Sequence, residues 1–283
     1  MKKLIGCVCV CLLLAFKPVS ADEPGSSNTE KVTRHMYAVY NEIDFSKCER
    51  MSYDAFEMAY TGYLNLKNAG KLNTSKDILT VCDLSLSSTI SRLWVIDLSK
   101  RKVLFNTYVA HGQGSGDEYA GAFSNDFNSH QSSLGFYVTG DTYRGEHGTS
   151  LHLAGMDNGF NDAAYDRGIV VHGADYVCDR YINANQKLGR SWGCPAVPAK
   201  LSLPIINAIK DGTCLFIYYP DRNYLQSAYW INKKITDLPE SNFYTGVMPV
   251  DMATPCQKTK TIRYVTNGRV DSVKEIPMPA DAR

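Results

Sequence analysis

The sequence predicts a mainly β protein, a β-sandwich or barrel with few helices and a small helical segment at its N-terminus. From residue 77 onward, short apolar runs rich in β-branched residues alternate with turn signals, which is typical of strands in an all-β domain. Only one good helical pattern, at residues 199–210, interrupts these runs. Because 44% of the 283 residues are hydrophobic, the chain can bury a core without depending on disulfides.

The first 21 residues have the pattern of a signal peptide. Lys2 and Lys3 form a positive start, residues 4–16 form an apolar core, and Ala21 ends a small-residue cleavage site. This apolar stretch is too short to span a bilayer comfortably, and no later segment has about 18 consecutive apolar residues. We therefore expect an exported protein, periplasmic or extracellular, with no membrane contact after signal cleavage.

A helical segment is expected over residues 22–76. Apolar side chains recur at helical spacing in residues 29–43, and a second helix has Ser52 as its N-cap and Gly70 where a C-cap is expected. An apolar stripe of this kind is more often core packing than a binding surface. We interpret the helical pair as an appendage packed on the β domain.

The β domain is expected to span residues 77–220, with a partly disordered C-terminal extension over residues 221–283. In that extension we expect an edge strand at residues 261–265 and a mobile tail from residue 270. Strands of the β domain are predicted at residues 78–82, 92–98, 103–111, 134–139, 150–154, 168–172 and 214–219.

One of these strands ends in a histidine that precedes a constrained cysteine. The strand closes at His172, and Cys194 lies 22 positions later between Gly193 and Pro195. Gly193 permits torsions and close approaches that a Cβ forbids, while Pro195 fixes φ just after the thiol. A thiol at a stiff turn, with a histidine to take its proton, predicts a Cys/His nucleophile pair. The alternative interpretation is a disulfide cysteine and a structural histidine, because exported cysteines are usually paired.

This segment resembles the active-site signature of the YkuD-type L,D-transpeptidases, in which a strand ends in His-Gly and a later Ser-x-Gly-Cys carries the nucleophile. The matching residues are His172-Gly173 and Ser191-Trp192-Gly193-Cys194. Residues 189–196 also match the Gly-Arg-Ser-x-Gly-Cys-Pro-Ala run of the murein L,D-transpeptidase catalytic domain branch. Two features depart from the wider family: the arginine that usually follows the cysteine is absent, and the loop between histidine and cysteine is longer.

The resemblance implies acyl transfer through a thioester on Cys194, with His172 as the base and no metal or cofactor. Ser191 is expected to orient the loop, and the backbone N–H groups of Gly193 and Cys194, with that of Trp192, are candidate oxyanion donors. Arg190 is a candidate for binding a substrate carboxylate or for bracing the loop. The expected catalytic residues are thus Cys194, His172, Ser191 and Gly193, and the expected substrate-binding residues are Arg190, Trp192 and Gly173.

The substrate implied by the resemblance is a peptidoglycan stem peptide. Attack on the third residue of a tetrapeptide would release D-alanine, and an acceptor amine would then form a 3→3 cross-link. Water at the same thioester would make the protein an L,D-carboxypeptidase, and a disulfide at Cys194 would make it a non-catalytic wall-binding protein. The 30 basic and 29 acidic residues give no electrostatic footprint for nucleic acid.

The other cysteines and histidines are secondary candidates. Three of the nine cysteines lie in the signal peptide, and the spacing of the rest fits no zinc-ribbon pattern. Polar, glycine-rich loops at residues 112–128 and 139–148 are expected to form the walls of a substrate groove. Four histidines in or near these loops each have a small chance of touching substrate: His111, His130, His147 and His152.

Overall fold

The computed structural model of the protein describes residues 28–239, 259–266 and 269–277. The expected signal peptide, residues 1–21, and Cys256 lie outside the described residues. Within the described ranges, no helix is long and apolar enough to cross a membrane.

A single eight-stranded sheet forms the body of the molecule and confirms the mainly β prediction. Most of its strands were expected within a few residues of where they occur. The loop expected at residues 139–148 is wrong for most of its length, because β4 continues to Gly145 and β5 begins at Gly148. The strands are β1 (Ile78–Asp83), β2 (Leu93–Asp97), β3 (Lys102–Thr107), β4 (Gly135–Gly145), β5 (Gly148–Gly155), β6 (Val170–Ala174), β7 (Ala196–Pro198) and β8 (Cys214–Tyr218).

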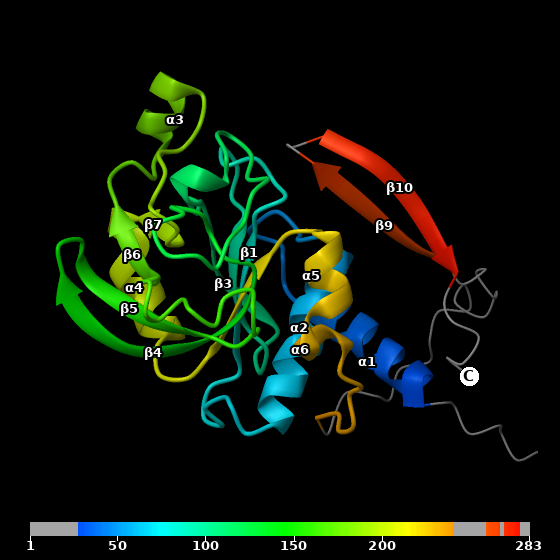
Figure 1. Ribbon diagram of the computed structural model, residues 1–283. Helices are drawn as coiled ribbons and strands as arrows, with labels where there is room; N and C mark the ends of the chain where they lie inside the picture. The colour runs from blue at the N-terminus through cyan, green and yellow to red at the C-terminus, as the bar shows by residue number, and fades with distance from the viewer. Residues whose placement is uncertain (1–27, 240–258, 267–268, 278–283) are drawn as a thin grey trace, which may run out of the picture.

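The sheet curls until its two edges nearly meet. Its strand order is β3-β2-β1-β8-β4-β5-β6-β7, with parallel pairing only for β1 with β8 and β6 with β7. Just after β3, the Ala110 N–H donates to the carbonyl of Ala196 in β7 at 2.8 Å. This contact joins the outermost strands into a near-barrel (Figure 1). The edge strand β7, which follows the cysteine turn, is therefore held from both sides.

Helices cover the sheet and fill the connections between strands. The helix predicted at residues 199–210 is confirmed as α4, and both N-terminal helices are present. Three short helices, α3, α5 and α6, were not expected. The helices are α1 (Asn28–Glu42), α2 (Tyr53–Asn68), α3 (Asp179–Asn185), α4 (Ala199–Ile209), α5 (Arg222–Ser227) and α6 (Tyr229–Asn232), with a 3₁₀ turn η1 (Gln113–Ser115).

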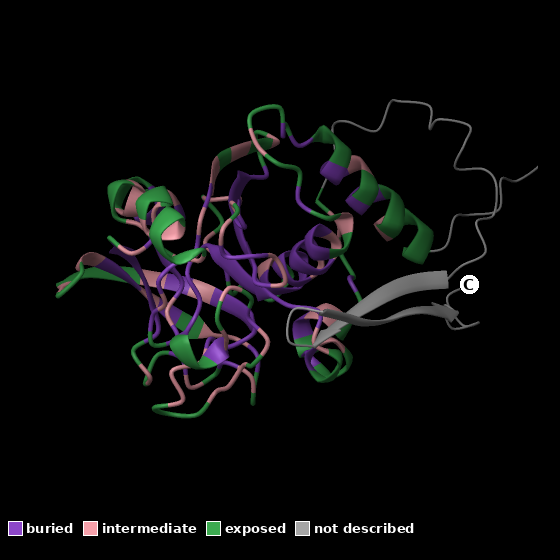
Figure 2. Ribbon diagram, turned by 90° about the horizontal axis from the view of Figure 1, so that it is seen from above, coloured by how far each residue is buried: buried purple, intermediate pink, exposed green. Residues whose placement is uncertain are grey.

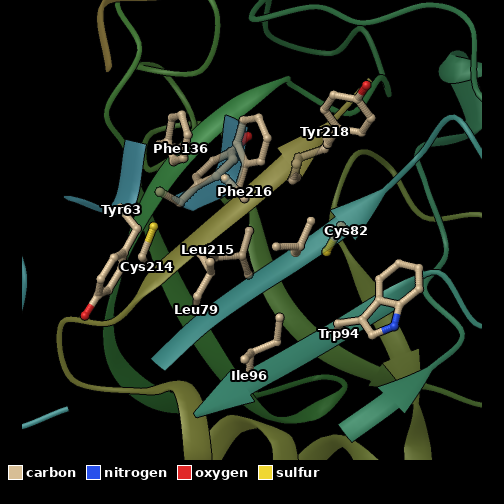
Figure 3. Packing of buried hydrophobic residues seen from close by; sticks show 14 of the residues in the cluster. Tyr63, Leu79, Cys82, Trp94, Ile96, Phe136, Cys214, Leu215, Phe216 and Tyr218 are labelled. Carbon is tan, nitrogen blue, oxygen red and sulfur yellow. The ribbon is translucent and has the colours of Figure 1, made fainter. Parts of the chain in front are cut away.

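The helix α2 belongs to the same hydrophobic core as the sheet. Its predicted N-cap is confirmed, because the Ser52 hydroxyl accepts the N–H of Ala55 at 3.2 Å. Most of α2 is buried, whereas much of α1 is exposed (Figure 2). Figure 3 shows Tyr63 of α2 in one cluster with Phe136 of β4 and Phe216 of β8. The helical pair is thus packed on the β domain as expected, and α2 shares the core of that domain.

Gly62 lets α2 approach the sheet closely. A Cβ added at this glycine would lie 2.0 Å from the ring of Phe136, which itself stacks on Phe216 with ring centroids 4.2 Å apart. No side chain larger than hydrogen fits there without moving the ring. This contact fixes the distance between α2 and the sheet.

The C-terminal extension packs back on α2 over its first part. Trp230 is buried and donates its indole N–H to the Met156 carbonyl at 2.8 Å, while Asn65 of α2 donates to the Trp230 carbonyl at 2.9 Å. The expected strand at residues 261–265 lies in β9 (Thr259–Thr266). It pairs with β10 (Arg269–Pro277) in a separate two-stranded sheet.

The second strand of that hairpin replaces the mobile tail expected from residue 270. The sequence places Asn267-Gly268 between two runs that contain β-branched residues, and Asn-Gly is the strongest short-range hairpin signal. Charge and proline content suggested a mobile segment, but the turn signal and the strand propensity on both sides favour the pairing that the structure has over residues 269–277.

We expect Gly62→Ala to lower the free energy of unfolding by about 1–2 kcal/mol, although alanine is the better helix former by ~1 kcal/mol. The reason is the collision with the Phe136 ring. Urea unfolding of both proteins measures the difference. In a Phe136→Leu background the added methyl has more room, so its penalty should shrink. An equal penalty in both backgrounds would contradict the packing explanation.

Candidate active site

The parallel pairing of β6 and β7 brings the predicted histidine and cysteine to the same edge of the sheet. His172 is in register with Ala196, and Gly173 is in register with Val197. Cys194 lies two residues before Ala196, so the chain returns from its long loop beside the strand it left. The structure therefore brings together the two groups that the sequence predicted would act as a pair.

The Cys194 thiol is free and is cradled by the backbone at the start of β6. The N–H of Val170 donates to Sγ at 3.5 Å, and Sγ donates to the carbonyl of Gly168 at 3.7 Å. These are its hydrogen bonds within the described residues, and neither involves His172. Catalytic hydrogen bonds are often long before substrate binds, so this resting arrangement is compatible with proton transfer.

The His172 imidazole is oriented as a base. Its Nδ1 lies 3.0 Å from the Gly173 carbonyl, which can only accept, so Nδ1 carries the proton. The other nitrogen, Nε2, makes no hydrogen bond within the described part of the chain and has its lone pair free. The carbonyl of Gly173 thus fixes the orientation of this histidine.

Both groups of the pair are neutral at rest. Burial lowers the pKa of His172, the nearby His147 lowers it further, and the bond to Gly173 opposes these effects. Burial also raises the pKa of the Cys194 thiol, against the Val170 N–H and the positive charge of Arg167. The thiol therefore rests protonated, and the thiolate forms only when an acceptor takes the proton.

The turn that carries the thiol is closed by Ser191. The hydroxyl of Ser191 donates to the Cys194 carbonyl at 2.6 Å and accepts the Gly193 N–H at 3.1 Å. Ser191 therefore orients the loop as the sequence predicted. The Gly193 N–H, which we expected to hold an oxyanion, is already occupied. The N–H groups of Cys194 and Trp192 have no acceptor among the described residues and remain the candidate oxyanion donors.

Gly193 is required by the geometry of the turn. Its φ is +122°, and an added Cβ would lie 2.7 Å from the Gln131 carbonyl oxygen. The carbonyl of Gly193 accepts the hydroxyl of Ser132 at 3.1 Å, and that hydroxyl also accepts the Gly112 N–H at 3.0 Å. The loop that contains Gln131 and Ser132 thus packs against the cysteine turn, and we call this loop the second wall of the turn. Sequence analysis had assigned no role to this wall.

The three expected substrate-binding residues differ in what they contact. Arg190 is partly buried, donates to the Gly116 carbonyl at 2.8 Å and pairs with Asp117 at 3.2 Å, so it braces the neighbouring loop. Trp192 is 71% exposed, although the His130 ring stacks on its indole. A Cβ on Gly173 would lie 2.7 Å from the Ser202 hydroxyl, so this glycine serves the packing of β6 against α4.

Two histidines from the polar loops stack on residues of the site. The ring of His147, at the tip of the β4–β5 hairpin, lies over His172 with centroids 4.5 Å apart. The ring of His130 lies nearly parallel to Trp192 at 4.9 Å. The β4–β5 hairpin therefore contacts His172, and the loop that contains His130 contacts Trp192. Their positions in loops were visible in the sequence, but the partners were not.

His111 is buried and supports the site from behind. Its Nδ1 lies 2.7 Å from the Arg92 guanidinium, which can only donate, so Nδ1 accepts and Nε2 carries the proton. This Nε2 faces the backbone of Gly116 and Asp117 without a hydrogen bond of normal geometry. The His111 carbonyl accepts the Ser191 N–H at 3.1 Å. His111 therefore does not touch substrate and instead anchors the cysteine turn.

The described residues hold no group of three His, Cys, Asp or Glu side chains that could bind a metal ion. A cavity of about 640 Å³ lies where β6 and β7 end and α4 begins, and neither Cys194 nor His172 lines it.

A buried imidazole and a free thiol thus lie at one edge of the near-barrel sheet. The family profile described as the L,D-transpeptidase catalytic domain matches residues 47–218. The chain therefore belongs to the L,D-transpeptidase catalytic domain family. The match includes α2, in agreement with the place of that helix in the core. No curated protein matches the chain.

Among solved structures, similar ones include an L,D-transpeptidase from Mycobacterium smegmatis, 10% identical with a TM-score of 0.33, over 51% of this chain and 59% of that one. L,D-transpeptidase 1 from Mycobacterium tuberculosis is 13% identical with a TM-score of 0.29, over 51% and 62%. An L,D-transpeptidase from Xylanimonas cellulosilytica is 12% identical with a TM-score of 0.29, over 66% and 93%. The chain thus spans less than two thirds of the mycobacterial proteins.

The buried His111 predicts a specific dependence of stability on pH. Burial, together with the Arg92 charge, lowers its pKa from 6.5 to about 3. The unfolded chain then binds the proton more tightly than the folded one. The stabilising contribution is therefore complete above about pH 6.5 and is lost progressively as the pH falls toward about 3.

We expect the wild type to lose about 2 kcal/mol more than His111→Gln between pH 8 and pH 5, since the variant has no titrating group at this position. Urea unfolding at several pH values measures both curves. The comparison cancels the other ionisable groups, which the two proteins share. Parallel curves would contradict the low pKa.

Proposed function

We propose that this protein is an exported cysteine acyl-transferase that forms 3→3 cross-links between peptidoglycan stem peptides through a thioester on Cys194. Membership of the L,D-transpeptidase family supports action on peptidoglycan. The observation that carries the catalytic assignment is the free thiol of Cys194 at the same sheet edge as His172, whose tautomer leaves Nε2 free as a base. Export rests on the signal-peptide pattern of residues 1–21.

The first half-reaction forms the thioester. His172 Nε2 takes the Cys194 proton, and the thiolate attacks the carbonyl carbon of the third residue of a tetrapeptide stem. The oxyanion is held by the N–H groups of Cys194 and Trp192, each donor being worth on the order of 3 kcal/mol. When the tetrahedral intermediate collapses, the C–N bond breaks and the terminal D-alanine leaves with the proton from His172.

The second half-reaction transfers the acyl group to an amine. The amine of a neighbouring stem attacks the thioester and loses a proton to His172. Collapse then breaks the C–S bond, and the proton returns to the Cys194 sulfur. Attack by water instead of the amine would release a tripeptide stem, which is the L,D-carboxypeptidase reaction. The free thiol favours either reaction over a wall-binding protein with Cys194 in a disulfide.

We expect Cys194→Ser to abolish turnover of purified tetrapeptide muropeptides and to leave the fold intact, because serine has no comparably acidic group for the imidazole to deprotonate. His172→Ala should reduce turnover nearly as much, and the double variant should be no worse than either single one, since the two residues act as a unit. Mass spectrometry of the products measures the loss and also separates cross-linked dimers from tripeptides.

Cys178→Ser is the matched control, because Cys178 lies in the same loop and its thiol bonds only the Asp175 carbonyl, at 3.2 Å, within the described residues. This variant should retain wild-type turnover. Turnover by Cys194→Ser within about tenfold of wild type would exclude Cys194 as the nucleophile.

A further inference from the structure

One arginine outside the predicted site touches the second wall of the cysteine turn. The Nη1 of Arg167 donates to the Ser124 carbonyl at 2.8 Å and to the Ser133 hydroxyl at 2.5 Å. Its Nη2 donates to the Gln131 carbonyl at 2.9 Å and to the Ser129 hydroxyl at 3.2 Å. The guanidinium therefore donates hydrogen bonds to four oxygens of one loop, residues 124–133.

Arg167 also directly precedes the backbone segment that hydrogen-bonds the Cys194 sulfur. The next residue, Gly168, accepts the Cys194 thiol with its carbonyl, and Val170 donates its N–H to Sγ. On the other side, the Gln131 carbonyl held by Arg167 is the atom that a Cβ on Gly193 would strike. Arg167 thus joins the two surfaces between which the cysteine turn is held.

The bonding of Arg167 argues against direct substrate binding. Its two terminal nitrogens have four N–H groups, and all four have protein acceptors. A bidentate pair with a substrate carboxylate would require two of these bonds to break. No carboxylate forms an ion pair with Arg167 among the described residues, although Asp126 acts on its charge through space. The positive charge is therefore not cancelled locally.

We propose that Arg167 is a positioning residue for the nucleophile, which fixes the Cys194 turn through Gln131 and stabilises the Cys194 thiolate by its charge. The proposal rests on Cys194 being the nucleophile of the proposed function. The ionisable groups that face the thiol are Arg167 before β6, His172 within β6 and Tyr176 after it. Of these described groups, only Arg167 carries a permanent charge, since the pKa of Tyr176 is raised to about 12 by burial.

The test is the pH dependence of Cys194 alkylation by iodoacetamide, followed peptide by peptide so that other cysteines are separated. Only the thiolate reacts, so the midpoint of the rate profile reports the thiol pKa. We expect Arg167→Gln to raise the midpoint by about one pH unit, which slows alkylation roughly tenfold at pH 7. Arg167→Lys keeps the charge and should stay within about 0.3 unit of wild type.

Arg34→Gln on α1 is the matched control, because it makes the same chemical change at an exposed ion pair with Glu30. It should leave the midpoint unchanged. An unchanged midpoint in folded Arg167→Gln would overturn the proposal, as would an equal shift in the lysine variant, which would indicate lost geometry rather than lost charge. If the glutamine variant does not fold, the lysine variant decides alone, and a shift of about one unit contradicts the role of charge.

Alkylation and turnover measurements together distinguish failure of this inference from failure of the proposed function. Alkylation needs no stem peptide, so a shifted midpoint without muropeptide turnover would support the role of Arg167 and oppose the acyl-transfer assignment. Turnover that depends on Cys194, together with an unshifted midpoint, would support the assignment and oppose the role of Arg167.

Discussion

The parallel pairing of β6 with β7 is the interaction on which the candidate site depends. It places Ala196 beside His172, and only two residues then separate this fixed point from Cys194. β7 is short, and its main contact on the other side is the bridge from Ala110 to Ala196. Closure of the near-barrel therefore also holds the Cys194 turn at the sheet edge that carries His172.

Burial gives the pair a resting state without charge. The same low-dielectric surroundings disfavour the thiolate and the imidazolium, since both charged forms lose hydration there. Fixed partial and full charges nearby, the Val170 N–H and the Arg167 guanidinium, offset part of this cost for the thiolate. The His147 ring instead lowers the pKa of His172 further and so disfavours the charged imidazolium. The thiol and the imidazole are thus both uncharged at rest.

Sequence alone predicted the sheet well, because strands, caps and turns leave local signals. It predicted that Ser191 orients the cysteine turn for the same reason. It missed the occupied N–H of Gly193, the second wall around Ser132 and the part played by Arg167. These depend on which residues meet across the fold, and no spacing in the chain records that Arg167 and Gln131 are neighbours. The pairing of β9 with β10 was missed for a different reason. The Asn-Gly turn signal was present in the sequence, but charge and proline content had suggested a mobile segment.

The missing arginine after the cysteine has a physical explanation in this fold. Members of the wider family carry it shortly after the nucleophile, whereas here Ala196 and Val197 occupy β7 and are fully buried. A guanidinium at either position would lose its hydration inside the closed barrel, with no described carboxylate placed to compensate it. Arg190, just before the turn, is already engaged with Asp117 and Gly116. The cation that we propose for the thiol comes from the other side of the turn, where Arg167 lies three residues before β6 begins at Val170.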